Sequence, residues 1–180
     1  MPDFDADAEL RDYAARRDIQ KLLYNYMRAQ DRLLPDLHRT VFARNAYVDC
    51  GHYKGSGAGF VDFAQGFLSE IMASQHLLGQ IDIDIDIDGD RASGEVYFLA
   101  QHRLVEDGAE KDLFVAGRYV DEYGREDGAW KIFRRFEIVD WARTDPAADG
   151  FLVAAPGLNM AGRRDEDFSA TRNWPAPLVG

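Results

Sequence analysis

The chain of 180 residues contains only one cysteine, Cys50, and four histidines. A single cysteine excludes an intramolecular disulfide and gives no zinc-binding pattern, so we interpret Cys50 as a packing residue. The sequence also has no glycine-rich phosphate-binding motif and no G-x-S-x-G elbow. The local signals of a nucleotide-binding protein and of an elbow-type serine hydrolase are therefore missing.

Basic residues are outnumbered, with 21 Lys and Arg against 32 Asp and Glu, a net charge of −11 and a pI near 4.7. This balance argues against nucleic acid or an anionic membrane as a partner. No apolar run approaches membrane-spanning length, and the acidic segment Met1–Asp5 lacks the apolar core of a signal peptide. We therefore expect a cytoplasmic protein. A hydrophobic content of 46% with 12% aromatics fits one globular domain and suits an apolar pocket.

Helical patterns dominate the first part of the chain. From about Asp7 to Asp31, apolar residues recur at i, i+3, i+4 and i+7, which predicts an amphipathic helix. Pro35 suits the first turn of a short second helix that runs through Phe42. A third amphipathic helix is expected to end near Met72, and the residue suited to cap its beginning is Ser56.

Beyond Ala73 the period of the apolar residues changes from 3.6 to 2, which is typical of strands. Three Asp-Gly pairs, spaced 19 and 20 residues apart, favour the left-handed backbone of tight hairpins. A short earlier strand is expected at Ala46–Asp49, before a glycine-rich loop, Gly51–Gly59. The expected strands of the later region are 80–87, 91–106, 110–124 and 129–142.

Such long antiparallel strands twist and coil, so the sheet should curve around the helices. The predicted fold class is α+β: a cone-shaped α+β barrel with N-terminal helices packed on a strongly curved antiparallel sheet around an internal pocket. This domain is expected to span residues 1–143. Residues 144–180 mix glycine, proline, alanine and charge without period. They predict an irregular C-terminal tail that wraps the domain or a neighbouring subunit, or is partly disordered.

Isoleucine alternates with aspartate from Ile81 to Asp88, which is the period of a half-buried strand. The pattern fixes the register, because a shift by one residue would bury the aspartates. The residues from Asp84 to Glu95 also satisfy the spacing of a calcium-binding loop. That loop needs a helix on both sides, and here strands are expected. We interpret the carboxylates as a solvated strand face and a hairpin turn, with calcium as a minor alternative.

His76 lies at the entrance to this strand and is the first candidate for chemistry. Its imidazole titrates near neutral pH in the absence of perturbation. Asp31 projects toward the apolar side of the first helix, where a buried carboxylate needs a partner. We expect the two to pair, with the carboxylate fixing the tautomer of a general base. The alternative is a core histidine that hydrogen-bonds to backbone.

Further side chains are candidates for the wall of the same cavity. His102 lies on the more apolar face of its strand, and Arg118 shares a face with apolar residues on the next strand. Core packing is the alternative for His102 and for Tyr26, and pairing with an acidic residue is the alternative for Arg118. The catalytic candidates are His76, Asp31, Tyr26 and His102, and the candidates for substrate binding are Arg118, Phe98 and Tyr53.

Two histidines and an aspartate can also form a facial metal triad. No local spacing of ligands supports one in this sequence, so we expect no metal and no cofactor.

Three strings of residues carry a resemblance to a known family. They are Ile19-Gln20-Lys21-Leu22 leading to Asp31, His76 before Asp88-Gly89-Asp90, and Gly117-Arg118-Tyr119 leading to Asp127-Gly128-x-Trp130. The order of helices, His76 and hairpins resembles the nuclear-transport-factor-2-like fold, and the strings look like its SnoaL-like branch. The resemblance covers about residues 10–142.

Members of this branch include scytalone dehydratase, hexachlorocyclohexane dehydrochlorinase and bile-acid 7α-dehydratase, which share an Asp–His dyad matched here by Asp31 and His76. Tyr26 matches the catalytic tyrosine of the bile-acid enzyme, and His102 looks like the second histidine of scytalone dehydratase. The resemblance implies a cofactor-independent, dehydratase-like lyase or isomerase for a hydrophobic cyclic small molecule. Tyr26, His102 or Arg118 would help the departing hydroxyl or halide, or stabilise an oxyanion.

The same fold hosts proteins without catalytic activity. The alternative function is therefore a ligand-binding protein or the small subunit of a ring-hydroxylating oxygenase. In either case a homo-oligomer, a trimer or a dimer, is expected, because one face of an open sheet needs cover.

Overall fold

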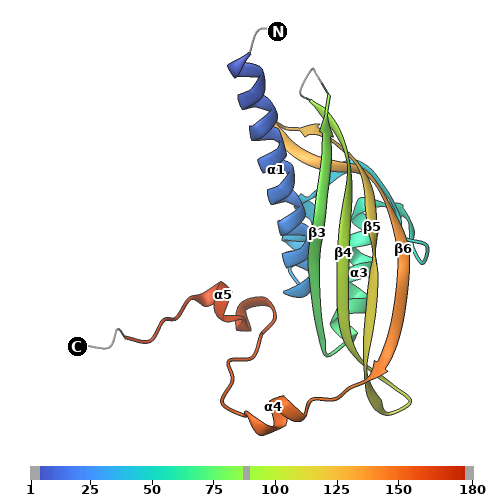
Figure 1. The fold of residues 1–180 in the computed structure, drawn as a ribbon, viewed down its shortest axis with the longest axis vertical. Coiled ribbons are helices and arrows are strands. Elements are labelled where there is room, and N and C mark those ends of the chain that lie inside the picture. Colours follow the sequence, from blue (N-terminus) through green and yellow to red (C-terminus); the bar gives the residue numbers. More distant parts are fainter. Residues whose placement is uncertain (1–4, 87–89, 177–180) are drawn as a thin grey trace.

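The computed structural model describes residues 5–86 and 90–176, and it shows helices packed against a long, curved sheet (Figure 1). The first half contains α1 (Ala6–Asp31), α2 (Pro35–Thr40), β1 (Phe42–Asp49), β2 (Lys54–Ser56) and α3 (Gly57–Glu70). The long strands are β3 (Ala73–Ile85), β4 (Arg91–Glu106), β5 (Ala109–Glu126) and β6 (Ala129–Pro146). The tail holds α4 (Gly150–Ala154), the 3₁₀ helix η1 (Arg164–Glu166) and α5 (Phe168–Thr171).

The three expected helices all form, although α2 ends at Thr40 and the expected end at Phe42 is instead the start of β1. The carboxylate of Asp5 caps α1 by accepting from the N–H groups of Asp7 and Ala8. Ser56 caps α3, as predicted, and its hydroxyl accepts from the N–H of Gly59 at 3.1 Å. This third helix ends at Glu70, before the expected boundary near Met72.

The sheet has six strands in the order β2-β1-β6-β5-β4-β3, and it is not closed, because β2 and β3 form its two edges. All pairs are antiparallel except β1 and β6, which run parallel. The sequence predicted the four-stranded antiparallel part, but the strand expected at Ala46–Asp49 is only the second half of β1, which begins at Phe42. It missed β2, and it began β3 at residue 80 although that strand begins at Ala73. The Asp88-Gly89 turn lies outside the described residues.

Among β3 to β6, register shifts in three places decide which side chains face the helices. One residue is inserted in β3 between Leu78 and Ile81, because the matching residues of β4, Phe98 and Val96, are only two apart. In β6 one extra residue lies between Ile132 and Arg134, and another between Val139 and Trp141. Each insertion is a β-bulge that moves the following residues of the strand to the opposite face.

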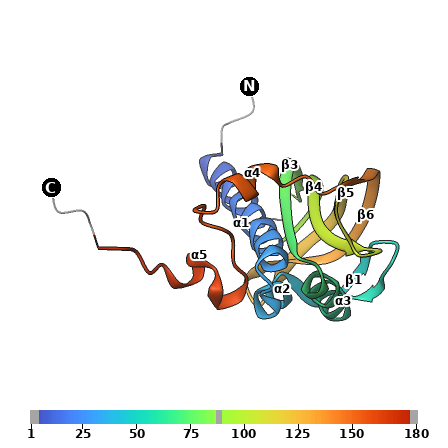
Figure 2. The same ribbon diagram turned by 90° about the horizontal axis from the view of Figure 1, so that it is seen from below.

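The concave face of the sheet packs against α1, α2 and α3 (Figure 2). Aromatic rings meet in this core, and the ring of Tyr26 lies 5.1 Å from that of His38 and 5.7 Å from that of Tyr119. Arg135 enters the same core and places its guanidinium 4.2 Å and 4.0 Å from the centroids of these two tyrosine rings. Its charge is paired with Asp121, whose side chain is fully buried.

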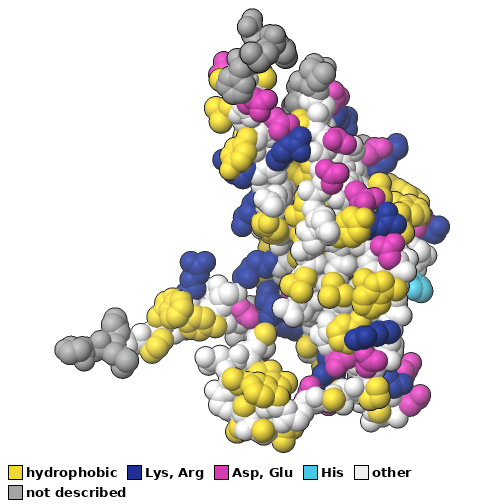
Figure 3. Space-filling model, in the orientation of Figure 1, with side chains coloured by type: hydrophobic (Ala, Val, Ile, Leu, Met, Phe, Trp, Pro, Cys, Tyr) yellow, Lys and Arg dark blue, Asp and Glu magenta, His cyan; other side chains and the backbone are white. Residues whose placement is uncertain are grey.

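The outer face of the sheet carries apolar side chains. Leu77, Leu99, Ala116 and Trp141 lie opposite one another across β3 to β6. Leu77 is 52% exposed and Trp141 is 49% exposed. Figure 3 views the molecule from this side and shows hydrophobic side chains gathered across the middle of the sheet. We call these four residues the outer apolar row.

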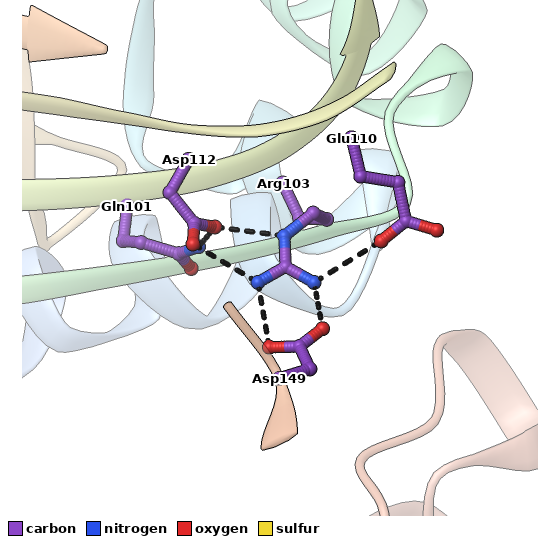
Figure 4. A network of polar contacts seen from close by, with 5 residues as sticks. All are labelled: Gln101, Arg103, Glu110, Asp112 and Asp149. Carbon is purple, nitrogen blue, oxygen red and sulfur yellow. Dashed lines mark hydrogen bonds and ion pairs between the residues drawn. The ribbon is translucent and has the colours of Figure 1, made fainter. Parts of the chain in front are cut away.

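β6 continues to Pro146, a little beyond the expected domain boundary, and the tail that follows is anchored at two places. Near its start, Asp149 receives two hydrogen bonds from Arg103, which also pairs with Asp112 of β5 and with Glu110 (Figure 4). This cluster holds the pKa of Asp112 and of Asp149 below its ordinary value, because Arg103 donates to both carboxylates.

Further along, Arg32 donates to the carbonyl of Gly162 at 2.7 Å and pairs with Asp167. Beyond α5 the chain points away from the body (Figures 1 and 2). Among the described residues, no helix has both the length and the hydropathy needed to cross a membrane.

Candidate active site

His76 and Asp31 lie in direct contact on the concave face. Nδ1 of the His76 imidazole is 2.7 Å from Oδ1 of Asp31, and Oδ2 of the same carboxylate accepts the backbone N–H of His76 at 3.0 Å. The aspartate therefore holds both the ring and the strand that carries it. The side chains are 6% and 12% exposed. With Nδ1 bound to the carboxylate, Nε2 is the nitrogen left to exchange a proton with another molecule.

The bulge in β3 puts His76 in this position. Strict alternation along the strand would place residue 76 on the same side as Asp82 and Asp84, which are exposed. The extra residue between Leu78 and Ile81 reverses the alternation, so that His76 and Ile83 both face the helices. Because of this insertion, the isoleucines that follow Gln80 and the earlier His76 can both face the helices.

Asp31 is the last residue of α1, which is a poor position for a carboxylate. The C-terminus of a helix carries partial negative charge, and an acidic side chain there costs on the order of 0.3–1 kcal/mol. Helix stability therefore does not account for Asp31. The two hydrogen bonds to His76 explain why a carboxylate stands at this position. Arg163 of the tail also lies close enough for the charge of Asp31 to raise the pKa of Arg163.

His102 is the nearest ring to the pair, with its centroid 5.1 Å from that of His76 in an edge-on arrangement. Burial first, and then the charge of His76, lowers the pKa of His102 to about 4, so its imidazole is neutral at neutral pH. Its Nδ1 is buried and has no hydrogen-bonding partner among the described residues. The hydroxyl of Ser74, which lies opposite His102 across β3 and β4, is in the same condition.

The other predicted residues lie at different distances from this centre. Tyr26 is inside the aromatic core at 1% exposure, and burial raises its pKa to about 12, so it keeps its proton at neutral pH. Phe98 faces inward and stacks on Tyr119 at 4.5 Å. Tyr53 stacks on Phe63 at 5.5 Å and donates its hydroxyl to the carbonyl of Ser56.

Arg118 does not face the cavity, and the expectation that it does is wrong. It lies opposite Tyr97 and Ile138 on the outer face, where it pairs with Glu95 at 3.1 Å and with Asp140 at 3.0 Å. The sequence assigned the inner face to the more apolar alternate set of β5. The outer face of this sheet also carries apolar side chains. Hydrophobicity therefore did not distinguish the two faces of β5, and Arg118 was assigned to the inner one.

A family model described as a SnoaL-like domain matches residues 11–136, which contain both members of the pair and all of the predicted site residues. The chain belongs to the SnoaL-like domain family.

Proteins from Mycobacterium tuberculosis and Mycobacterium bovis, both uncharacterised, are each 32% identical to this SnoaL-like chain over 136 residues. The match covers 72% of this chain and 86% of each relative.

Solved structures share the fold at lower identity. Hexachlorocyclohexane dehydrochlorinase LinA-type3 from Novosphingobium barchaimii superposes with a TM-score of 0.67 at 19% identity, over 85% of this chain and 98% of that one. A scytalone dehydratase-like protein from Novosphingobium aromaticivorans gives a TM-score of 0.66 at 20% identity, over 80% and 94%. A nuclear transport factor 2-like superfamily protein from Salmonella enterica gives a TM-score of 0.62 at 14% identity, over 77% and 95%. These likenesses confirm the α+β fold.

Pockets lie on both sides of the sheet in the described part of this SnoaL-like domain. The larger, about 500 Å³, is on the outer side of the sheet around Val120 and Phe136, away from His76. The smaller, about 260 Å³, is a partly open hollow lined by Asp31 and Ser74 on one side and by tail residues 161–163 on the other. Phe63, Phe67 and Val139 are also exposed.

Two charged residues near the pair escaped the sequence prediction. Arg163 donates from the tail to the carbonyls of Leu68 and Ile71, both at 2.9 Å, and burial lowers its pKa. Glu137 lies on the concave face of β6, opposite Tyr119. Arg163 sits in a segment without period, and the bulge after Ile132 hides the inward direction of Glu137, so no pattern in the sequence indicated either one. Among the described residues, no cluster of three or more His, Cys, Asp and Glu side chains has the arrangement of a metal site.

Proposed function

We propose that this SnoaL-like protein is a cofactor-independent lyase or isomerase for a hydrophobic cyclic small molecule. The observation that carries the proposal is the hold of Asp31 on both the ring and the backbone N–H of His76. That hold fixes the tautomer, keeps Nε2 free and stabilises the imidazolium that forms when the ring accepts a proton.

In the proposed reaction, Nε2 of His76 removes a proton from a carbon next to an activating carbonyl group, and the ring then carries the proton as an imidazolium paired with Asp31. The neutral His102, 5.1 Å away, and the buried hydroxyl of Ser74 have hydrogen-bonding capacity to spare. Both are positioned to orient the substrate oxygen. The apolar lining supplied by Phe98 and Phe67 suits a ring system without charge.

Exchange of α-hydrogens tests the proton abstraction without knowledge of the natural substrate. A cyclic ketone, 1-tetralone, is incubated with the protein in D₂O, and incorporation of deuterium is followed by NMR. We expect His76→Ala to slow the protein-dependent exchange by about 10²- to 10⁴-fold, the usual contribution of a general base, and Asp31→Asn to slow it substantially.

Gln75→Ala is the matched control, because this neighbour of His76 on β3 points to the exposed face. Circular dichroism of each variant verifies its fold. Full exchange activity in His76→Ala would show that the imidazole is not the base.

The alternative is a ligand-binding protein or the small subunit of a ring-hydroxylating oxygenase. It is supported by the likeness to an aromatic ring hydroxylase-like structure from Novosphingobium aromaticivorans, at a TM-score of 0.63 and 24% identity. A larger protein that co-purifies from the native host would favour this alternative.

A further inference from the structure

Glu137 is an inward-facing carboxylate without a partner in the part of the chain that the structure describes. It lies directly opposite Tyr119 in the β5–β6 ladder, and Tyr119 is 2% exposed, so both side chains are on the concave face. Tyr119 in turn stacks on Phe98, with ring centroids 4.5 Å apart, and meets Tyr26 edge-on at 5.7 Å. Within residues 5–86 and 90–176, no hydrogen bond or ion pair satisfies the Glu137 carboxylate.

Ionisable groups from several elements face Glu137 closely enough for their charges to interact. Arg135 is on the same strand, His76 is on β3, and Tyr26 and Tyr119 come from α1 and β5. The loop after β1 adds His52 and Cys50. Burial is the strongest influence and raises the pKa of Glu137, while the positive charges of Arg135 and the histidines oppose it.

The nearby cation does not neutralise Glu137, because it is already engaged. Arg135 donates to both oxygens of Asp121, at 2.8 Å and 2.6 Å, and both side chains are almost entirely buried. Glu137 is partly buried and has no cation of its own among the described residues, and this surrounding shifts its carboxyl toward the protonated form, in which it can donate a proton. The concave face thus holds a base, His76, and a carboxylic acid on the facing part of the sheet.

We propose that Glu137 is the general acid that protonates the leaving oxygen, and that the substrates are therefore cyclic β-hydroxy carbonyl compounds rather than halides. This proposal rests on the proposed function. A halide departs as an anion and needs no proton, whereas a hydroxyl group leaves readily only as water. An acid in this position contributes to the loss of water alone.

The step balances in atoms and electrons. His76 takes the α-proton, the electrons of the C–H bond form the C=C bond, and the electrons of the C–O bond stay with oxygen. That oxygen receives the proton of Glu137 and leaves as water. The imidazolium of His76 and the carboxylate of Glu137 return to their starting forms when one proton is passed to solvent and another is taken up.

The protonation of Glu137 is measured by ¹³C NMR of protein labelled at the glutamate carboxyl carbons. Glu137→Gln identifies the signal of residue 137. Glu122→Gln identifies an exposed reference on the outer face of β5. We expect the midpoint of Glu137 to lie clearly above that of Glu122. A midpoint at or below that of Glu122 overturns the proposal.

The leaving group is tested with two probes, 3-hydroxy-1-tetralone, which loses water to give 1-naphthol, and 3-chloro-1-tetralone, which loses HCl. We expect Glu137→Gln to slow the loss of water by about 10²-fold or more, and to leave HCl loss and the α-hydrogen exchange of 1-tetralone within several-fold of the wild type. Glu122→Gln should behave as wild type throughout.

Equal losses on both probes, or no loss on the hydroxy ketone, would refute the role of Glu137 as the acid for the leaving group. Failure of the proposed function has a different signature, because the wild type then exchanges no α-hydrogens of 1-tetralone. In that case the titration midpoint still decides whether Glu137 holds a proton.

Discussion

At the scale of single residues, the concave face carries two imidazole and two carboxyl groups in different states. Asp31 is bonded twice to His76, His102 is kept neutral by burial, and Glu137 has no hydrogen-bond or ion-pair partner among the described residues. The sequence indicated His76, Asp31 and His102, because each stands out against an apolar pattern. It could not indicate Glu137, which on plain alternation belongs to the outer face.

Buried histidines give the stability of this protein a definite dependence on pH. Burial lowers the pKa of His38 to about 3 and that of His102 to about 4, whereas both titrate near 6.5 in an unfolded chain. The unfolded state therefore binds more protons below about pH 6.5, so the free energy of unfolding falls with decreasing pH, by about 1.4 kcal/mol per pH unit for each histidine.

We expect His38→Gln to lose its share of this slope between pH 6 and pH 5 in urea titrations. His52→Gln is the control, since the side chain of His52 is exposed on a loop. An unchanged slope in His38→Gln would contradict the assignment of the slope to buried histidines.

At the scale of elements, the sequence predicted most of the helices and hairpins but not the bulges. Periodicity, the cap at Ser56 and the Asp-Gly turns depend on neighbouring residues, so a single chain displays them. A bulge depends on how two strands align, and it leaves no local pattern. In β6 the bulge after Ile132 turns Arg135 and Glu137 inward and Phe136 outward, against the order that hydrophobicity alone suggests.

Gly117 is where β5 accommodates the second bulge of β6. A Cβ atom built on it would lie 2.0 Å from the carbonyl oxygen of Ile138, which is backbone and has no side-chain freedom to move away. We expect Gly117→Ala to lower the free energy of unfolding by roughly 1–3 kcal/mol, as overpacking usually does.

Gly66→Ala is the matched substitution, and we expect it to change the free energy of unfolding in the opposite direction. Gly66 lies inside α3 with open space around it, so alanine should raise stability by about 0.5–1 kcal/mol through its better helix propensity. Chemical denaturation of both variants measures the pair. A neutral Gly117→Ala would mean that the bulge relaxes at no cost.

At the scale of the whole molecule, the sheet presents apolar surface on both sides. Its concave side is covered by helices, but the outer apolar row of Leu77, Leu99, Ala116 and Trp141 is not covered by any described part of this chain. Exposed apolar surface of this kind is typical of a protein interface. We propose that this face packs against another copy of the chain.

Light scattering coupled to gel filtration checks this proposal. We expect a mass that is two or three times the 20.3 kDa of the chain, and a monomer after Trp141→Asp. Leu10→Asp, on the exposed side of α1, should leave the mass unchanged. A monomeric wild type would contradict the proposal, and a complex with a larger polypeptide would favour the oxygenase-subunit alternative.

Because β3 is at the edge of the open sheet, the alternation of isoleucine and aspartate also affects how this strand meets other molecules. An edge strand offers unpaired backbone groups to any other strand that approaches, which is the first step of aggregation. Here Asp82, Asp84 and Asp86 are exposed along that edge, and Arg16 of α1 already donates to the carbonyl of Ile83. A second copy that aligned its own β3 alongside would bring the two rows of carboxylates together. The aspartates that fix the register of β3 thus also disfavour pairing of this isoleucine-rich edge strand with β3 of a second copy.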